Sequence, residues 1–285
     1  MYFDFHCHLF NRHIISNVSA KSEMVKELKL DVVEAAGSFE PQDLQKSAQA
    51  SNVVGCVILP TATPEKVVSQ NDRCYETSLN YDRIIPFFTL HPNMAGLESE
   101  IERSLDRGIN GFKFSSFSQR FDLRSDDVSK MLETLESAGV SRNMSPIVVF
   151  DTFCKADSGF GANPEHLTTP DRLSQIYPKY PGINFVGAHM GGLMADFDDL
   201  KKYLEPAPNF YLDTSNAAHT LERAQFVELL KIHGPSNVLF GTDWPWFAHR
   251  HEIPLIRSLL EEADYSDSEC AGIFLDNALR LMKTN

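Results

Sequence analysis

The sequence has few cysteines, no excess of positive charge and no long apolar run, and each absence narrows what the chain can be. Its five cysteines form no CxxC pair, which argues against a zinc knuckle or a thioredoxin-like motif and fits reduced thiols. The formal net charge of −13 disfavours nucleic acid and anionic membrane as partners, because both repel an acidic surface. No stretch approaches the roughly 20 apolar residues of a transmembrane helix, and no signal peptide is recognisable. We therefore expect a cytoplasmic protein with a small-molecule substrate.

Short apolar runs followed by amphipathic segments repeat along the whole chain. Several runs are continuously apolar, as expected where parallel strands are buried on both faces. The alternation has no break in composition, which favours a single (β/α)8 TIM-barrel domain over residues 1–285. An open doubly wound sheet is the alternative, although no glycine-rich phosphate turn follows any strand. The eight candidate strands are Tyr2–His8, Val53–Leu59, Ile84–Leu90, Gly111–Phe114, Pro146–Phe150, Ile183–Ala188, Asn209–Leu212 and Val238–Phe240.

Two connections are longer than a minimal barrel requires. Residues 9–39 follow the first strand and residues 151–168 follow the fifth. In a TIM barrel, connections that follow strands lie on the catalytic face. Long structureless loops are often lids or binding loops. These segments are therefore either lids over the site or family-specific insertions without a function in catalysis.

Residues of metal-ligand type stand at the ends of three predicted strands. His6 and His8 are two apart on the first strand, so both imidazoles project from one face and can chelate a divalent cation. His189 ends the sixth strand before two glycines, and Asp243 follows the eighth. Each residue alone has an ordinary structural explanation, such as a helix cap for the aspartate. Their shared placement on one rim instead predicts a catalytic site.

Five motifs together resemble the amidohydrolase superfamily. They are DFHCH at the N-terminus, AHMGG around His189, YLDTS at 211–215, LFGTDWP around Asp243 and IFLDNALRLM near the C-terminus. The similarity is closest to the amidohydrolase-related branch that includes aminocarboxymuconate-semialdehyde decarboxylase and related lactonases. The resemblance spans Asp4 to Met282 and is compatible with a homodimer.

The resemblance implies a divalent metal, zinc in the first place, bound by His6, His8, His189 and Asp243. It also implies that Asp243 accepts a proton from metal-activated water and that His189 is either a ligand or a catalytic acid/base group. A carboxylate beside such a water can return the proton to the leaving group. Hydrolysis of a C–N or C–O bond in a small amide, ester or lactone is the leading expectation. Nonoxidative decarboxylation and a metal-free lactonase are the alternatives on the same barrel, and a binding protein without activity is a third.

One position departs from the family pattern. Phe150 stands where the resemblance places a further histidine ligand at the end of the fifth strand. Three protein ligands plus water suffice for a catalytic zinc. Asp151 or His91 is a candidate replacement, and loss of the metal is the remaining option.

Lys113, Asp151 and His91 are the predicted substrate-binding residues. Lys113 lies on the fourth strand, where it can hold a substrate carboxylate or form an ion pair in the barrel interior. The resemblance adds a third option, because a carboxylated lysine at this position bridges two metals in binuclear members of the superfamily. Arg120 and Arg124 in the following loop are further cations for an anionic substrate, with a solvated surface role as the default. Asp213 and Ser215 are expected to be structural hydrogen-bond partners near the rim.

Overall fold

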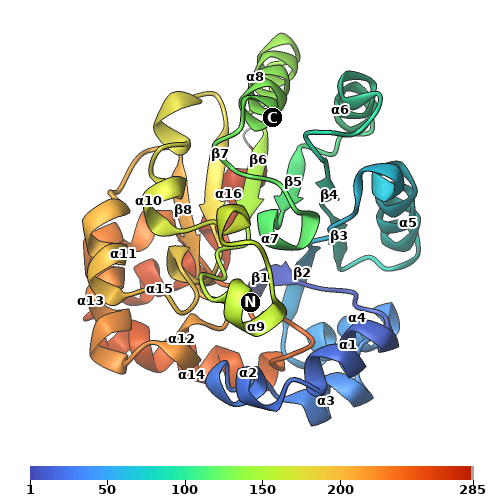
Figure 1. Ribbon diagram of the computed structural model, residues 1–285. Coiled ribbons are helices and arrows are strands. Elements are labelled where there is room, and N and C mark those ends of the chain that lie inside the picture. Colours follow the sequence, from blue (N-terminus) through green and yellow to red (C-terminus); the bar gives the residue numbers. More distant parts are fainter. Residues whose placement is uncertain (284–285) are drawn as a thin grey trace.

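The strands of the protein surround a common axis in the computed structural model, which describes residues 1–283 (Figure 1). Every pair of neighbouring strands is parallel, as buried apolar runs joined by helices require. All eight predicted strands are present, and the third is interrupted at Phe87 and divided into two. The strands are β1 (Tyr2–Cys7), β2 (Val53–Ile58), β3 (Ile84–Pro86), β4 (Phe88–Thr89), β5 (Gly111–Phe114), β6 (Ile147–Phe150), β7 (Asn184–Gly187), β8 (Phe210–Asp213) and β9 (Val238–Leu239).

The ring closes where β1 meets the segment that follows β9. The amide of Phe5 donates to the carbonyl of Phe240 over 2.8 Å, and the amide of Asp243 donates to the carbonyl of His6 over 2.9 Å. The amide of His8 donates to the carbonyl of Trp244 over 2.7 Å. These bonds complete the TIM barrel predicted from the sequence. They also join the backbone that carries both histidines to the backbone that carries Asp243.

Helices cover the outside of the ring and close one of its ends. Among residues 1–283, no helix is long and apolar enough to cross a membrane. The helices are α1 (Arg12–Ser19), α2 (Ser22–Glu27), α3 (Val32–Gly37), α4 (Pro41–Ala50), α5 (Val67–Asn80), α6 (Leu97–Asp106), α7 (Ser116–Gln119), α8 (Asp126–Ser141), α9 (Ala156–Phe160), α10 (Pro170–Leu173), α11 (Phe197–Tyr203), α12 (Ala217–Thr220), α13 (Arg223–His233), α14 (His249–Glu262), α15 (Asp267–Ala271) and α16 (Asn277–Lys283).

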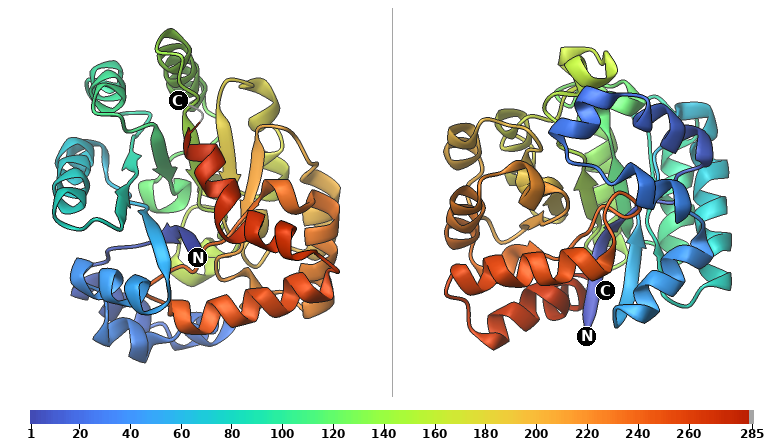
Figure 2. Two further views of the ribbon diagram at one scale, coloured as in Figure 1. Left: turned by 180° about the vertical axis from the view of Figure 1, so that it is seen from behind. Right: turned by 90° about the horizontal axis from the view of Figure 1, so that it is seen from below.

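Three apolar clusters divide the interior. One fills the space between the strands and the outer helices, and a second fills the barrel itself. Ala278 and Leu281 of α16 belong to the second cluster, so this helix closes the end of the barrel where the strands begin. Figure 2, seen from behind, shows α16 in red across the end opposite to α9. The plugged end leaves the other end, where the strands finish, for the functional site.

The two long connections contain short helices. The segment 9–39 includes α1, α2 and α3, and the segment 151–168 includes α9. Their buried apolar residues form the third cluster together with Trp246 and Phe247. The ammonium of Lys21 donates to the carbonyl of Gly159 over 3.0 Å, which ties the first segment to the second. Each segment therefore buries an apolar face of its own. Residues 284 and 285 of the predicted domain lie outside the described residues.

A bulge in β1 sets the direction of the two histidines. The chain advances three residues on β1, from Asp4 to Cys7, while β2 advances two, from Cys56 to Ile58. Phe5 belongs to the cluster inside the barrel. The next residue, His6, also points inward, because its ring contacts Asp213 on β8. A bulge of this kind inserts one extra residue and re-aims the side chains that follow. Asp4, before the bulge, faces the outer helices.

Candidate metal and substrate site

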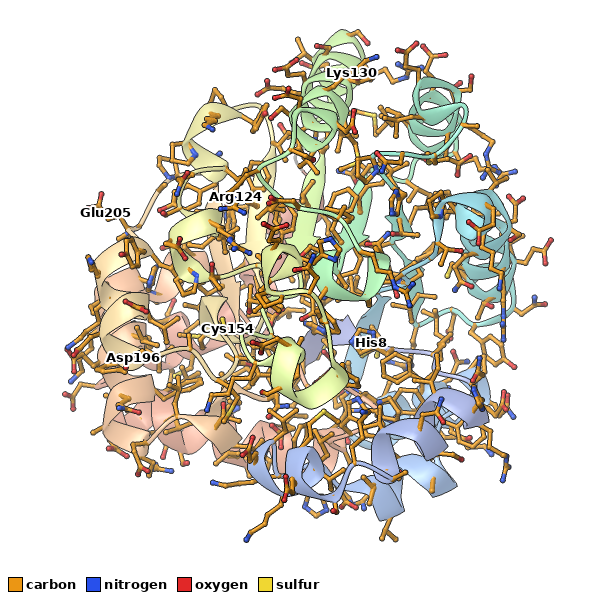
Figure 3. The ribbon with its side chains drawn as sticks, viewed as in Figure 1. His8, Arg124, Lys130, Cys154, Asp196 and Glu205 are labelled. Carbon is orange, nitrogen blue, oxygen red and sulfur yellow. The ribbon has the colours of Figure 1, made fainter. Side chains whose placement is uncertain are left out.

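Three ligand atoms converge at the open end of the barrel. Nε2 of His6 lies 3.1 Å from Nε2 of His8. Oδ1 of Asp243 lies 3.8 Å from the first of these nitrogens and 3.3 Å from the second. Such separations suit ligands that lie about 2.0–2.2 Å from one shared ion. Figure 3 shows His8 where β1 and β2 end, inside the ring of strands.

The hydrogen bonds of the two imidazoles support a cation at this point. Nδ1 of His6 lies 2.8 Å from Oδ2 of Asp213, and Nδ1 of His8 lies 3.1 Å from the carbonyl oxygen of Leu59. Both partners accept hydrogen bonds, so in a neutral imidazole the proton sits on Nδ1 and Nε2 keeps its lone pair. Two lone pairs and a carboxylate then face one another, and a divalent cation satisfies all three. Oriented imidazoles of this kind are typical of metal sites.

Asp213 is the residue that fixes His6. It is fully buried at the end of β8, and its Oδ1 accepts from the amide of His189 over 3.0 Å and from the hydroxyl of Ser215. Burial alone would raise the pKa of Asp213, but its contacts with His6 bring that pKa far below its usual range. Burial lowers the pKa of His6 to about 4, against the opposing effect of Asp213. The pair therefore presents a neutral imidazole, the form that binds metals.

His189 lies beside this set and does not complete it. Its ring centroid is 4.8 Å from that of His6, while its Nδ1 lies 2.9 Å from the carbonyl oxygen of Ser215. With the proton of Nδ1 donated to that carbonyl, Nε2 remains for a ligand. His189 lines the cavity above the site. The structure thus brings all four predicted residues together, with His6, His8 and Asp243 as the tight group and His189 as a neighbour.

Several site residues have backbones in the left-handed region. The φ angles are 56° at His189, 65° at Asp243 and 54° at Asn216. This region is sparsely populated by residues other than glycine, and such residues cluster at functional sites. Each of the three lies within four residues of the end of a strand, where the chain turns across the mouth of the barrel.

A cavity of about 690 Å³ opens above the ligand atoms. The helices of both long connections contribute to its walls, which places them where a lid or binding loop was expected. Polar side chains line the bottom of the cavity and apolar side chains line its walls, as is common in small-molecule sites. Its polar lining includes His8, Lys113, Ser115, Asp151, His189, Asn216 and Asp243, and its aromatic lining includes Phe10, Phe117, Phe153, Phe160 and Trp246.

Lys113 is a buried cation that faces this cavity. Its side chain is fully buried, and its Nζ has no hydrogen-bond partner among the described residues. Burial lowers the pKa of Lys113, and the negative charges of nearby aspartates, Asp151 first, oppose that shift. A buried ammonium without a partner is costly, and an anionic ligand removes that cost. Arg120 also lines the cavity but is exposed, and Arg124 pairs with Asp122 at the surface.

The end of β6 differs from the sequence expectation by one residue. Phe150 packs in the outer cluster, with its ring stacked 6.1 Å from that of Phe185. Asp151 is the residue that lines the cavity, and its Oδ2 accepts from the hydroxyl of Ser115 over 3.1 Å. Side chains alternate between the two faces of a strand, so adjacent residues point to opposite sides. Asp151, not Phe150, therefore occupies the place that faces the site.

His91 is a predicted substrate-binding residue that does not line the cavity. Its Nε2 lies 2.9 Å from the carbonyl oxygen of Gln119, and its Nδ1 accepts from the amide of Asn93 over 3.1 Å. Both ring nitrogens thus organise the loop after β4. This arrangement does not support the prediction that His91 binds the substrate or replaces a ligand.

A second group of buried ligand-type residues lies on the outer side of β1. Cys7, Cys56 and His249 approach one another there, and Nε2 of His249 lies 2.9 Å from Oδ2 of Asp4. Burial would lower the pKa of His249, but its hydrogen bond to Asp4 helps to raise it to about 10. The hydroxyl of Ser47 lies 2.8 Å from the other ring nitrogen. This group is an internal ion pair that connects β1 to α14 and α4.

Known protein families and solved structures include matches to this chain. A family model described as Amidohydrolase matches residues 3–283, whereas among curated proteins none matches the sequence. A dihydroxybenzoic acid decarboxylase from a Polaromonas species, with bound manganese and the inhibitor 2-nitroresorcinol, is 18% identical. It covers 99% of this chain and 97% of its own, with a TM-score of 0.69.

Two further solved structures have the same fold. The 5-carboxyvanillate decarboxylase of Sphingomonas paucimobilis is 14% identical, with a TM-score of 0.66 over 99% of this chain and 98% of that one. A probable 2-pyrone-4,6-dicarboxylic acid hydrolase from Acinetobacter baumannii, with citric acid bound, is 15% identical. Its TM-score is 0.65, again over 99% and 98% of the two chains. At these identities the likeness concerns the TIM-barrel fold.

Proposed function

Because the chain belongs to the amidohydrolase family, whose model matches residues 3–283, we propose that it is a metal-dependent decarboxylase of a small aromatic carboxylic acid. The observation that carries the proposal is Lys113, whose buried ammonium has no hydrogen-bond partner within residues 1–283 and faces a cavity with aromatic walls. The dihydroxybenzoate and carboxyvanillate decarboxylases among the similar structures support it. Hydrolysis was the leading expectation from the sequence, and these relatives favour its alternative.

The proposed metal is zinc or manganese, held by His6, His8 and Asp243. A metal held there would supply Lewis-acid polarisation of a substrate oxygen. Lys113 binds the carboxylate, and the aromatic walls hold the ring. The bond from the ring to the carboxylate carbon breaks, carbon dioxide leaves, and the electron pair stays on the ring carbon. That carbon takes a proton from the carboxyl group of Asp243, which solvent protonates again.

The direct test is release of carbon dioxide by metal-loaded protein. We expect release from at least one acid in a panel of 2,6-dihydroxybenzoate, 5-carboxyvanillate and singly hydroxylated benzoates. Dialysis against a chelator should abolish it, and Mn²⁺ or Zn²⁺ should restore it, because the three ligand atoms otherwise have no ion to share. Ring products are measured alongside by chromatography. Unchanged activity after the metal has been removed, as shown by elemental analysis, would contradict the metal-dependent mechanism.

Lactone hydrolysis is the second candidate. The similarity to a probable 2-pyrone-4,6-dicarboxylic acid hydrolase favours it, and that substrate also carries carboxylates that suit Lys113. In this reaction Asp243 takes a proton from water instead of giving one to carbon. Cleavage of 2-pyrone-4,6-dicarboxylate without release of carbon dioxide distinguishes it from decarboxylation.

Removing the Lys113 charge should weaken substrate binding more than it slows turnover. For Lys113→Met we expect KM to rise by about 10- to 100-fold, the loss expected for a hydrogen bond to a charged group. Steady-state kinetics and metal content of the purified variant provide the measurement. Lys130→Met is the matched control, because Lys130 is exposed on α8 (Figure 3). An unchanged KM would show that another group holds the carboxylate.

A further inference from the structure

Asn216 has a buried carboxamide that nothing in the described chain satisfies. Its side chain is 1% exposed, and neither Nδ2 nor Oδ1 has a hydrogen-bond partner within residues 1–283. Buried amides almost always find partners, since an unpaired donor or acceptor loses its hydration without return. Asn216 precedes α12, where asparagine commonly caps a helix, but its side chain makes no capping bond. The usual structural explanation for this residue therefore fails.

The carboxamide belongs to the cavity. Asn216 is among the residues that line it, and its backbone is held at φ 54° and ψ −24°. Asparagine tolerates this conformation better than most residues, but the backbone is still strained, and such strain is typical of functional sites. The preceding residue, Ser215, accepts the hydrogen bond of His189 through its carbonyl. The chain at Asn216 is thus anchored directly to the imidazole of His189.

We propose that Asn216 is a specificity-determining residue that binds a hydroxyl substituent of the substrate beside His189. A hydroxyl oxygen accepts from Nδ2 and its hydrogen is donated to Oδ1, so one neutral group satisfies both atoms. Lys113 takes the carboxylate, and Asn216 supplies a second, uncharged point of recognition on the same ring. The substrate class is accordingly a hydroxylated aromatic acid. This inference rests on the proposed function for the carboxylate and adds the hydroxyl.

The test compares binding of benzoate with that of 2-, 3- and 4-hydroxybenzoate to the metal-loaded protein by isothermal titration calorimetry. We expect at least one hydroxybenzoate to bind about tenfold more tightly than benzoate, as one hydrogen bond can provide. In Asn216→Gly this preference should disappear while benzoate binding stays the same. Glycine suits the left-handed backbone, so the variant removes the side chain without added strain.

Asn143→Gly is the matched control, because Asn143 is also left-handed, with φ 55°, but exposed and away from the cavity. Asn216→Ala, which removes both polar atoms, serves if the glycine variant fails to fold, and it should also lose the hydroxyl preference. A preference that survives in the variants overturns the proposal. The proposal is also overturned if the wild type binds all four acids equally or binds none of them. Because the readout is affinity, absence of carbon dioxide release would reject the proposed reaction and leave this comparison intact.

Discussion

Asp243→Asn should lower turnover by about 10²–10⁴-fold, the range of a positioned acid or base, while the fold remains intact. Asparagine has the same shape but neither carries charge nor exchanges a proton near pH 7. The amide of Asp243 would still donate to the carbonyl of His6, so the closure of the barrel is preserved. The measurement is kcat for carbon dioxide release, with circular dichroism and thermal unfolding as checks on folding.

Asp82→Asn provides the control for the Asp243 experiment, because Asp82 is exposed on the loop before β3. It should have wild-type kinetics. Full activity of Asp243→Asn would remove the central residue of the proposed mechanism. A variant that keeps its metal but not its turnover would separate the proton-transfer role of the carboxylate from its role as a ligand.

His249→Gln should destabilise the protein by about 3–5 kcal/mol, because it leaves the carboxylate of Asp4 buried without its cation. Both side chains of this pair are fully buried. The pKa of His249 is raised from 6.5 to about 10 in the folded protein. A raised pKa contributes stability in full below the unfolded value and loses it as the pH rises through the folded value. The wild-type free energy of unfolding should therefore fall between about pH 6.5 and 10.

Urea unfolding at pH 6 and at pH 9, followed by tryptophan fluorescence, measures this contribution. The His249→Gln variant should lose most of the difference between the two pH values. His251→Gln is the control, because His251 is exposed on the same helix, and it should keep the wild-type difference. Equal stability of His249→Gln and the wild type at pH 6 would mean that the pair contributes nothing.

The strands and the metal ligands were predictable because both leave short-range signals. Parallel strands buried on two faces are continuously apolar, so their positions could be read to within one or two residues. His6, His8 and Asp243 each stand at the end of such a run, and barrel topology brings strand ends together. Asp213 was expected as a structural partner, and its hydrogen bond to His6 confirms that expectation.

The facing of individual side chains was harder to predict. A shift of one residue moves a side chain to the other face of a strand, which is why Phe150 was assigned the place that Asp151 occupies. His91 also follows a strand, but the backbone of the next loop takes both its nitrogens. Asn216 was missed because the sequence does not reveal an unsatisfied amide. Its only signal was its position directly after the strand-end motif YLDTS.

The single extra residue in β1 gives this strand two separate tasks. Before it, Asp4 serves the ion pair with His249; after it, His6 and His8 serve the cavity. With the same residues in a regular strand, alternation from Phe5 would turn His6 and His8 toward the outer helices and Cys7 into the barrel. In this barrel the register of β1 as well as ligand identity determines whether a metal can bind, so a change in strand pairing would remove the metal centre without a substitution at any ligand.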